Sequence, residues 1–352
     1  MKSYFRKEID AIAGYVPGEQ PKLANLIKLN TNENPYPPSP QVTEVLRNFD
    51  PDRLRRYPDP TADALRELFA ASVGMKRENI IIGNGSDDLL TMIFRAFTSP
   101  ELPVAIFDPT YSLYPVLAAM QGAKVIKIAL DRENFSYPED AVSRAGNANL
   151  LIITRPNAPT GNCASRELVR QICRDFDGIV LIDEAYSDFS LDNCADLAAE
   201  FDNVLVMRTF SKGSSMAGLR LGYAFGNENL INGLMKLKDS YNVDMLSQEL
   251  AKANFVDRAY REKCVRQIVS DREKLATDLT ALGFKVIPSS TNFLFAAPPD
   301  GDGEGCFAAL REKAVIVRYF PGEITGRYLR ITIGTPTENA RLLEVLKERF
   351  AK

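Results

Sequence analysis

The feature that most constrains this chain is a regular alternation of short apolar runs with stretches long enough to form helices. The apolar runs are residues 80–82, 104–107, 124–128, 150–153, 179–182 and 204–207. Most of them are continuous in Ile, Val and Leu, which is typical of strands that are covered on both faces. This βαβ pattern predicts an α/β fold with a large, doubly wound and mostly parallel sheet.

A further helix is expected before the first of these strands, after the segment RRYPDP. Thr61 can serve as its N-cap, because a hydroxyl can accept a hydrogen bond from a free N–H of the first turn. Leu65, Leu68 and Phe69 fall on one face of the helix, and Gly74 is a favourable residue for its end.

The two ends of the chain depart from the βαβ pattern. The N-terminal residues are rich in Pro and Asn, and proline restricts the backbone, so we expect an extended arm there. Near the C-terminus, a long charged helical stretch leads into short strands at 285–287, 293–296, 315–317 and 328–333 and a last helix from about Glu338. We therefore predict an N-terminal arm (1–40), a large domain (41–240) and a small α+β C-terminal domain (241–352), with the helical stretch at 246–282.

The composition narrows the possible functions. The 352 residues include no His, which excludes Ser-His-Asp and Cys-His catalysis and every His-containing metal site. An enzyme of this kind needs a lysine, carboxylate, tyrosine, cysteine or cofactor to move protons near neutral pH. Lys plus Arg (43) nearly balances Asp plus Glu (46), which argues against nucleic-acid binding. With no membrane-length apolar run, no visible signal peptide and no CxxC motif, we expect a cytoplasmic protein without a metal.

Polar residues that could hold a ligand follow the predicted strands, where ligands gather in α/β sheets. After the first strand, GNGSDD permits a tight turn, and Ser86 and Asp87 begin a helix whose free N–H groups favour an anion such as phosphate. Tyr111 follows the second strand and could cover a flat ligand. Alone, each has a simpler explanation as a capped turn or a buried aromatic residue.

A carboxylate and a lysine follow two later strands. Asp183 ends an apolar strand, with Tyr186 three residues on, and Lys212 lies among small and hydroxyl residues near Arg220. A desolvated lysine beside a fixed cation has a lowered pKa, so it can react with an aldehyde and later move a proton. A single lysine is more often a solvated surface charge. Together, however, these groups at one sheet edge match the needs of pyridoxal 5′-phosphate.

In its motifs the chain resembles the fold-type I pyridoxal-phosphate aminotransferases, and within them the histidinol-phosphate aminotransferase family. The resemblance covers nearly the whole length, through YVPGE, LNTNENPYPPSP, RYPDP, GNGSDD, DPTYSLY, PNAPTG, DEAY, TFSKGSSMAGLRLGY and YLRITIGT. It implies a homodimer that transfers the amino group of L-histidinol phosphate to 2-oxoglutarate, giving imidazole-acetol phosphate and glutamate in histidine biosynthesis.

The resemblance also implies roles for single residues. Lys212 would bind the cofactor's aldehyde and act as general base and acid, Asp183 would pair with its ring nitrogen, and Tyr186 would contact its phenolic oxygen. The other cofactor-binding residues would be Gly85, Ser86, Asp87, Tyr111, Thr209, Ser211 and Arg220, with Tyr57 reaching the phosphate of the neighbouring subunit. The substrate would be lined by Tyr15, Asn32, Arg318 and Arg330.

Two positions depart from the family pattern. Ala158 stands where an Asn commonly contacts the phenolic oxygen, so either Asn157 substitutes for it and binds the cofactor or Tyr186 does more of the holding. Tyr319 follows Arg318 where an Asp is common. Within the same fold, an aromatic-amino-acid aminotransferase and a threonine-phosphate decarboxylase remain alternatives. Outside it, a nicotinamide-dependent oxidoreductase is disfavoured because Asp88 replaces the third Gly of GxGxxG. A non-catalytic binding protein would be expected to lack Lys212.

Overall fold

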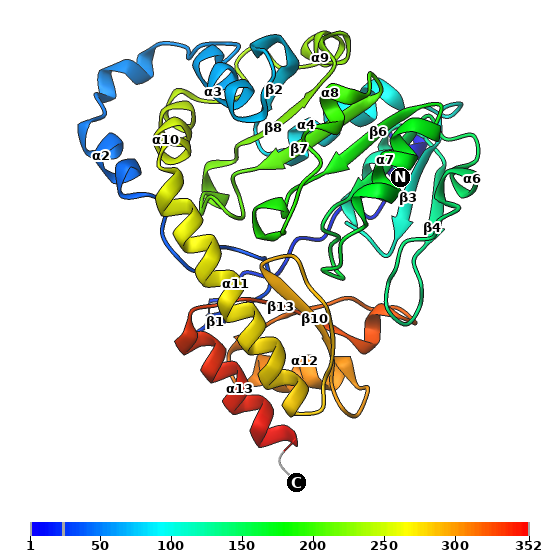
Figure 1. Cartoon of the computed structure of the whole chain (residues 1–352), viewed down its shortest axis with the longest axis vertical. Coiled ribbons are helices and arrows are strands. Elements are labelled where there is room, and N and C mark those ends of the chain that lie inside the picture. Colours follow the sequence, from blue (N-terminus) through cyan, green and yellow to red (C-terminus); the bar gives the residue numbers. More distant parts are fainter. Residues whose placement is uncertain (1, 23–24, 351–352) are drawn as a thin grey trace.

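The computed structural model describes residues 2–22 and 25–350. A seven-stranded sheet forms the larger part of the molecule, in the order β2-β8-β7-β6-β5-β3-β4 (Figure 1). Its strands are β2 (Ile80–Gly83), β3 (Val104–Asp108), β4 (Val125–Ala129), β5 (Leu150–Thr154), β6 (Ile179–Asp183), β7 (Val204–Thr209) and β8 (Gly222–Gly226). Only β8 among them runs antiparallel to its neighbours. The predicted α/β fold with a mostly parallel sheet is confirmed.

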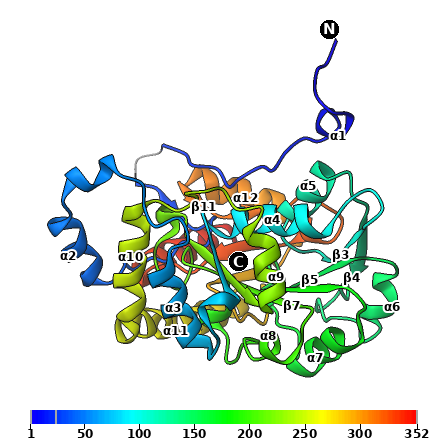
Figure 2. The same cartoon turned by 90° about the horizontal axis from the view of Figure 1, so that it is seen from above.

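Helices cover both faces of this sheet, which is why most residues of its strands are apolar and buried (Figure 2). One face packs against α4 (Ser86–Phe97), α5 (Leu113–Met120) and α9 (Glu228–Met235). The other packs against α2 (Pro40–Asn48), α3 (Asp63–Val73), α6 (Ala141–Ala145), α7 (Arg166–Asp175) and α8 (Leu197–Glu200). At the carboxyl edge of the sheet, the N-terminus of α4 meets the loops that follow β5, β6 and β7.

The capping prediction for α3 is wrong at its start and right at its end. Ala62, with φ of +50°, occupies the N-cap position, and the Asp59 carboxylate accepts a hydrogen bond from the N–H of Asp63 at 2.8 Å. A carboxylate that reaches over the turn thus replaces the Thr61 hydroxyl. The helix ends at Gly74, whose φ is +71°.

The C-terminal part forms a four-stranded antiparallel sheet in the order β12-β13-β10-β9. Its strands are β9 (Lys285–Ile287), β10 (Phe293–Ala297), β12 (Arg318–Tyr319) and β13 (Leu329–Thr332), packed with α11 (Arg258–Ala281), α12 (Gly303–Glu312) and α13 (Pro336–Phe350). The expected single helix at 246–282 is two helices, because Asp257 ends α10 (Met245–Val256) and accepts a hydrogen bond from the N–H of Tyr260 at the start of α11. The division into a large and a small domain near residue 240 stays a prediction.

The N-terminal arm has little regular structure and joins the two sheets. It contains α1 (Lys7–Asp10) and β1 (Ile27–Lys28), and β1 pairs in parallel with β11 (Val315–Ile316). In Figure 2 the arm runs across the top of the molecule toward α5. This path brings residues 30–33 beside β13 and the loop after β7. In the described part of the chain, no helix has the length and apolarity to span a membrane.

Candidate active site

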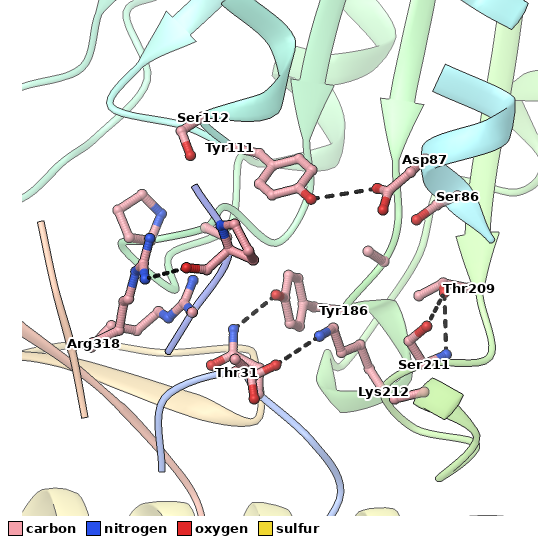
Figure 3. Close-up of a pocket in the computed structure, with 18 of the residues that line it drawn as sticks. Thr31, Ser86, Asp87, Tyr111, Ser112, Tyr186, Thr209, Ser211, Lys212 and Arg318 are labelled. Carbon is pink, nitrogen blue, oxygen red and sulfur yellow. Dashed lines mark hydrogen bonds between the residues drawn. The ribbon is translucent and has the colours of Figure 1, made fainter. Parts of the chain in front are cut away.

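A cavity of about 520 Å³ lies where the carboxyl ends of β3, β5, β6 and β7 meet the N-terminal arm and the strands β12 and β13 (Figure 3). Thirteen of the predicted site residues line it: Tyr15, Asn32, Ser86, Asp87, Tyr111, Asp183, Tyr186, Thr209, Ser211, Lys212, Arg220, Arg318 and Arg330. They come from the arm, from the strand ends and from the C-terminal sheet. The fold therefore gathers at one place residues that are as far apart in sequence as Tyr15 and Arg330.

Asp183 is a buried carboxylate at the end of β6. One oxygen accepts a hydrogen bond from the hydroxyl of Tyr114 at 2.6 Å, and the other accepts from the N–H of Ala185 at 3.0 Å. Burial raises the pKa of Asp183 to about 6, although both hydrogen bonds oppose that change. A carboxylate with these neutral partners lacks charge compensation and would gain stability from a cationic ligand atom.

Lys212 lies in the loop after β7 and points into the same cavity as Tyr186 (Figure 3). Its amine donates to the carbonyl oxygen of Thr31 at 3.0 Å and lies 5.8 Å from the ring centroid of Tyr186. Burial lowers the pKa of Lys212 to about 8, and Arg330 lowers it more than Arg220 does. The sequence prediction of a lowered pKa is supported, but the main cationic neighbour comes from β13.

We expect this lowered pKa to be visible in chemical labelling of the cofactor-free protein. Because a neutral amine reacts and an ammonium does not, acylation of Lys212 should rise to half its maximal rate near pH 8. An ordinary exposed lysine should require about pH 10.4. The rates can be followed by peptide mass spectrometry, and a midpoint of Lys212 at that ordinary value would contradict the prediction.

An anion site lies at the N-terminus of α4. Arg220 approaches the Ser211 hydroxyl at 3.4 Å and the Asp87 carboxylate at 3.3 Å, and Thr209 donates to the Ser211 hydroxyl at 3.1 Å. Gly85, with φ of +84°, lets this guanidinium approach, since a Cβ there would lie 2.5 Å from the Nη2 of Arg220. Free N–H groups at a helix start, hydroxyls and a guanidinium are the donors that a phosphate requires.

Asn32 connects the arm to both sheets, and its φ is +56°. Its side-chain amide donates to the Tyr186 hydroxyl at 2.9 Å, and its amide oxygen accepts from the Thr332 hydroxyl at 3.0 Å. Its backbone carbonyl accepts from the amide of Asn292 at 3.0 Å. Asn32 is buried and fully bonded, so it sets the position of the Tyr186 ring.

Arg318 and Arg330 line the part of the cavity that lies against the N-terminal arm. Arg330 donates to the carbonyl of Asn30 at 2.9 Å, and its Nε is buried without a partner among the described residues. Arg318 donates to the carbonyls of Val16 and Pro17 at 3.0 and 3.2 Å. Burial, together with Arg318, lowers the pKa of Arg330. These guanidinium groups are bonded to neutral oxygens and can accept an anion.

Known proteins match this chain over nearly its whole length. Residues 24–346 match the family model described as aminotransferase class I and II. The chain belongs to this family. The aminotransferase is 41% identical over 349 residues to histidinol-phosphate aminotransferase 1 of Nostoc sp., covering 99% of this chain and 98% of the relative. It is 44% identical over 350 residues to histidinol-phosphate aminotransferase 2 of Thiobacillus denitrificans, covering 98% and 97%.

The fold of the aminotransferase is also that of a solved structure. Histidinol-phosphate aminotransferase from Sinorhizobium meliloti, in complex with pyridoxal-5′-phosphate, has a TM-score of 0.89 at 22% identity and is covered over 99% of both chains. The fold-type I architecture predicted from the motifs is therefore confirmed.

Three predicted residues of the aminotransferase do not line the cavity. Gly85 lies directly beneath Arg220. Asn157 is fully buried, and its amide donates to the Pro109 carbonyl at 2.9 Å and to the Thr160 hydroxyl at 2.7 Å, while Ala158 reaches the cavity wall. Tyr57 is 77% exposed and stacks on Tyr241 at 4.3 Å between ring centroids. Its expected contact with the phosphate of the neighbouring subunit stays a prediction.

Sequence reasoning missed several residues of the aminotransferase's cavity. Tyr114 donates a hydrogen bond to Asp183. It belongs to the motif DPTYSLY and lies three residues after Tyr111, but no role was expected for it. That spacing places both rings on one side of a helix start, which was the available signal. The Thr31 carbonyl, which accepts from Lys212, carries no signal of its own because any residue supplies a carbonyl.

Proposed function

We propose that this aminotransferase uses pyridoxal 5′-phosphate to transfer the amino group of L-histidinol phosphate to 2-oxoglutarate, giving imidazole-acetol phosphate and glutamate in histidine biosynthesis. The observation that carries the proposal is a single cavity lined by Asp183, Lys212, Arg318 and Arg330. The names of the relatives that match at 41% and 44% identity support the substrate.

The residues present fit the cofactor. Asp183 is buried with neutral partners and is suited to a protonated ring nitrogen, and the anion site at Ser86 and Arg220 is suited to the phosphate. Lys212 has a lowered pKa and is suited to the aldehyde. The Tyr186 hydroxyl, already oriented by Asn32, would hold the phenolic oxygen.

Each protein group has a task that follows from its position. When bound, the cofactor supplies an aldehyde and an electron-withdrawing ring. The amine of Lys212, partly neutral near pH 8, accepts a proton from the substrate carbon and returns it at a neighbouring atom. The Asp183 carboxylate holds a positive ring nitrogen in place. The enclosing arm, through Tyr15 and its neighbours, limits the access of water.

Arg318 and Arg330 are proposed to bind the anionic group of the substrate. Histidinol phosphate brings a phosphate and 2-oxoglutarate brings carboxylates, and a guanidinium can bond either in a bidentate manner. The unpartnered Nε of Arg330 supplies a donor that such an anion would satisfy. One clamp can therefore serve both halves of the reaction.

Arg330→Ala is expected to weaken both half-reactions by about 100-fold in kcat/KM, because a charge-assisted hydrogen bond to each substrate is lost. The rates can be followed by stopped-flow absorbance with histidinol phosphate for one half and 2-oxoglutarate for the other. Arg327→Ala, which removes an exposed arginine three residues away, is the matched control and should leave both unchanged. A loss confined to one half-reaction would contradict the shared clamp.

The substrate is tested by mixing the cofactor-loaded protein with histidinol phosphate, phenylalanine, tyrosine and glutamate. We expect the visible band of the bound cofactor to decay fastest with histidinol phosphate. Much faster decay with phenylalanine would favour the aromatic-amino-acid alternative. Release of CO₂ from threonine phosphate would favour the decarboxylase.

The quaternary state and the cellular location are part of the same proposal. The exposed Tyr57–Tyr241 pair favours a homodimer in which Tyr57 reaches the neighbouring subunit's phosphate. We also propose that the enzyme acts in the cytoplasm on small-molecule substrates, without nucleic-acid or membrane partners. Sedimentation of the loaded enzyme at micromolar concentration tests the dimer.

A further inference from the structure

A chain of hydroxyl groups leads away from the Asp183 oxygen that does not bond the N–H of Ala185. The Tyr114 hydroxyl lies 2.6 Å from Asp183 Oδ2 and 2.9 Å from the Thr154 hydroxyl. The Thr154 hydroxyl lies 3.0 Å from that of Thr110, which in turn lies 3.0 Å from the amide oxygen of Asn157. The chain thus joins α5 and the ends of β3, β5 and β6.

The far end of the chain has a fixed orientation. The Asn157 amide nitrogen donates to the Pro109 carbonyl at 2.9 Å and to the Thr160 hydroxyl at 2.7 Å. Its oxygen must therefore face Thr110 as an acceptor. This explains why Asn157 does not reach the cavity: its side chain anchors the hydroxyl chain instead.

Counting protons shows that the donors of this chain of hydrogen bonds are arranged differently when Asp183 is ionised and when it is protonated. Three hydroxyls carry three protons, but there are four contacts between Asp183 and Asn157. When Asp183 is ionised, Tyr114 donates to it and Thr110 donates to Asn157, so the Thr154 proton serves only one of the two contacts between them and the other stays open. When Asp183 is protonated, it supplies the fourth proton and every donor turns toward Asn157.

The ionised arrangement has the stronger bond at its charged end. A hydrogen bond to a carboxylate is about twice as strong as one between neutral groups, so the short Tyr114 contact outweighs the one contact that stays open. A Thr154 hydroxyl that donates to Tyr114 strengthens the bond from Tyr114 to Asp183, because hydroxyls that donate in sequence polarise one another.

We propose that Tyr114 is a positioning residue that keeps Asp183 ionised for the cofactor's ring nitrogen, supported by Thr154 and Thr110 and anchored by Asn157. The consequence for cofactor binding rests on the proposed function, whereas the effect on Asp183 does not. Of the other groups that face Asp183, the carboxylates of Asp87 and Glu184 oppose its ionisation, so Tyr114 supplies the main side-chain contribution in favour. Lys212 and Tyr186 share the cavity with Asp183.

The first test measures the ionisation of Asp183 without the cofactor. The Tm of the cofactor-free protein and of Asp183→Asn is recorded from pH 4 to 8, and the gap between the two should widen from about pH 4 and level off near pH 6, the pKa of Asp183 in the folded protein. In the Tyr114→Phe background, the gap between that variant and Tyr114→Phe/Asp183→Asn should level off about 1–2 pH units higher. An unchanged pH would overturn the proposal.

Tyr137→Phe is the matched control. Tyr137 is a nearby tyrosine whose hydroxyl donates to the backbone carbonyl of Thr154 at 2.9 Å and does not touch Asp183. Its removal should leave the pH at which the gap levels off near 6, which separates a specific effect from the general loss of a buried hydrogen bond. If Tyr114→Phe does not fold, Thr154→Val takes its place, with a smaller upward shift expected and no shift contradicting the chain.

The second test measures the Kd for pyridoxal 5′-phosphate over the same pH range. Tyr114→Phe should bind about 10-fold more weakly at pH 6–7, with the difference vanishing above the raised pKa of Asp183, and Tyr137→Phe should match the unmodified protein. Equal affinities of Tyr114→Phe and the unmodified protein at every pH would contradict the consequence for cofactor binding. If the unmodified protein does not bind the cofactor at any pH, the proposed function fails, and the Tm test still decides the role of Tyr114.

Discussion

Replacing Lys212 with alanine is expected to lower kcat/KM by at least about 10⁴-fold, because the variant loses both the group that binds the aldehyde and the group that moves the proton. The cavity keeps Asp183 and the anion site, so the variant should still bind pyridoxal 5′-phosphate. After borohydride reduction and digestion, the unmodified protein should carry the cofactor on the Lys212 peptide, and the variant should carry none.

Two controls separate chemistry from charge. Lys212→Arg keeps a cation beside the Thr31 carbonyl but cannot react with the aldehyde, so it should be as inactive as Lys212→Ala. Lys274→Ala removes a largely exposed lysine from α11 and should retain full activity. Activity of Lys212→Arg within tenfold of the unmodified enzyme would show that this lysine acts only as a charge.

Asp183→Asn is expected to lower activity and to stabilise the cofactor-free protein. Activity should fall about 10²–10³-fold, the usual loss on removing one electrostatic group aimed at the reacting system. The pKa of Asp183 is about 6 in the folded protein and about 3.9 when unfolded. Between these values the folded state binds more protons, so the stability contributed by this group falls as pH rises, and above pH 6 the full cost of about 3 kcal/mol is present.

Asparagine carries no charge and avoids this cost. The difference in unfolding free energy between Asp183→Asn and the unmodified cofactor-free protein should therefore increase from pH 4 to pH 8 in urea denaturation. Asp177→Asn, at an exposed position after α7, should show no such trend. A difference that is constant across this range would mean that Asp183 is not destabilised by burial.

Much of the sheet could be predicted because its strands are buried on both faces and read as continuous apolar runs. β8 was missed, since its five residues begin and end in glycine and follow the Lys212 loop without a helix between. It is antiparallel and forms by a direct return of the chain, which the βαβ pattern does not describe. The split at Asp257 was missed because a single Asp between two helix-forming segments is a weaker sign of a helix end than Gly or Pro.

Within the site, residues that act through side chains at strand ends could be predicted, and residues that act through tertiary contacts could not. Asp183 and Lys212 stand at predictable places after apolar strands. The influence of Arg330 on the pKa of Lys212 depends on how β13 packs against the loop after β7, which no local pattern specifies. The role of Asn157 depends in the same way on three contacts formed by the cis-proline loops around it.

The position of Asn32 has a consequence for synthesis on the ribosome. Its partners Thr332 and Asn292 lie 300 and 260 residues later in the chain. The sheet that carries Asp183 and Lys212 can form while later residues are still being added, but Asn32 does not have both of these partners until β13 has emerged. Nascent chains that end before β13 should therefore have the lysine and the carboxylate in place yet leave the cavity open to water.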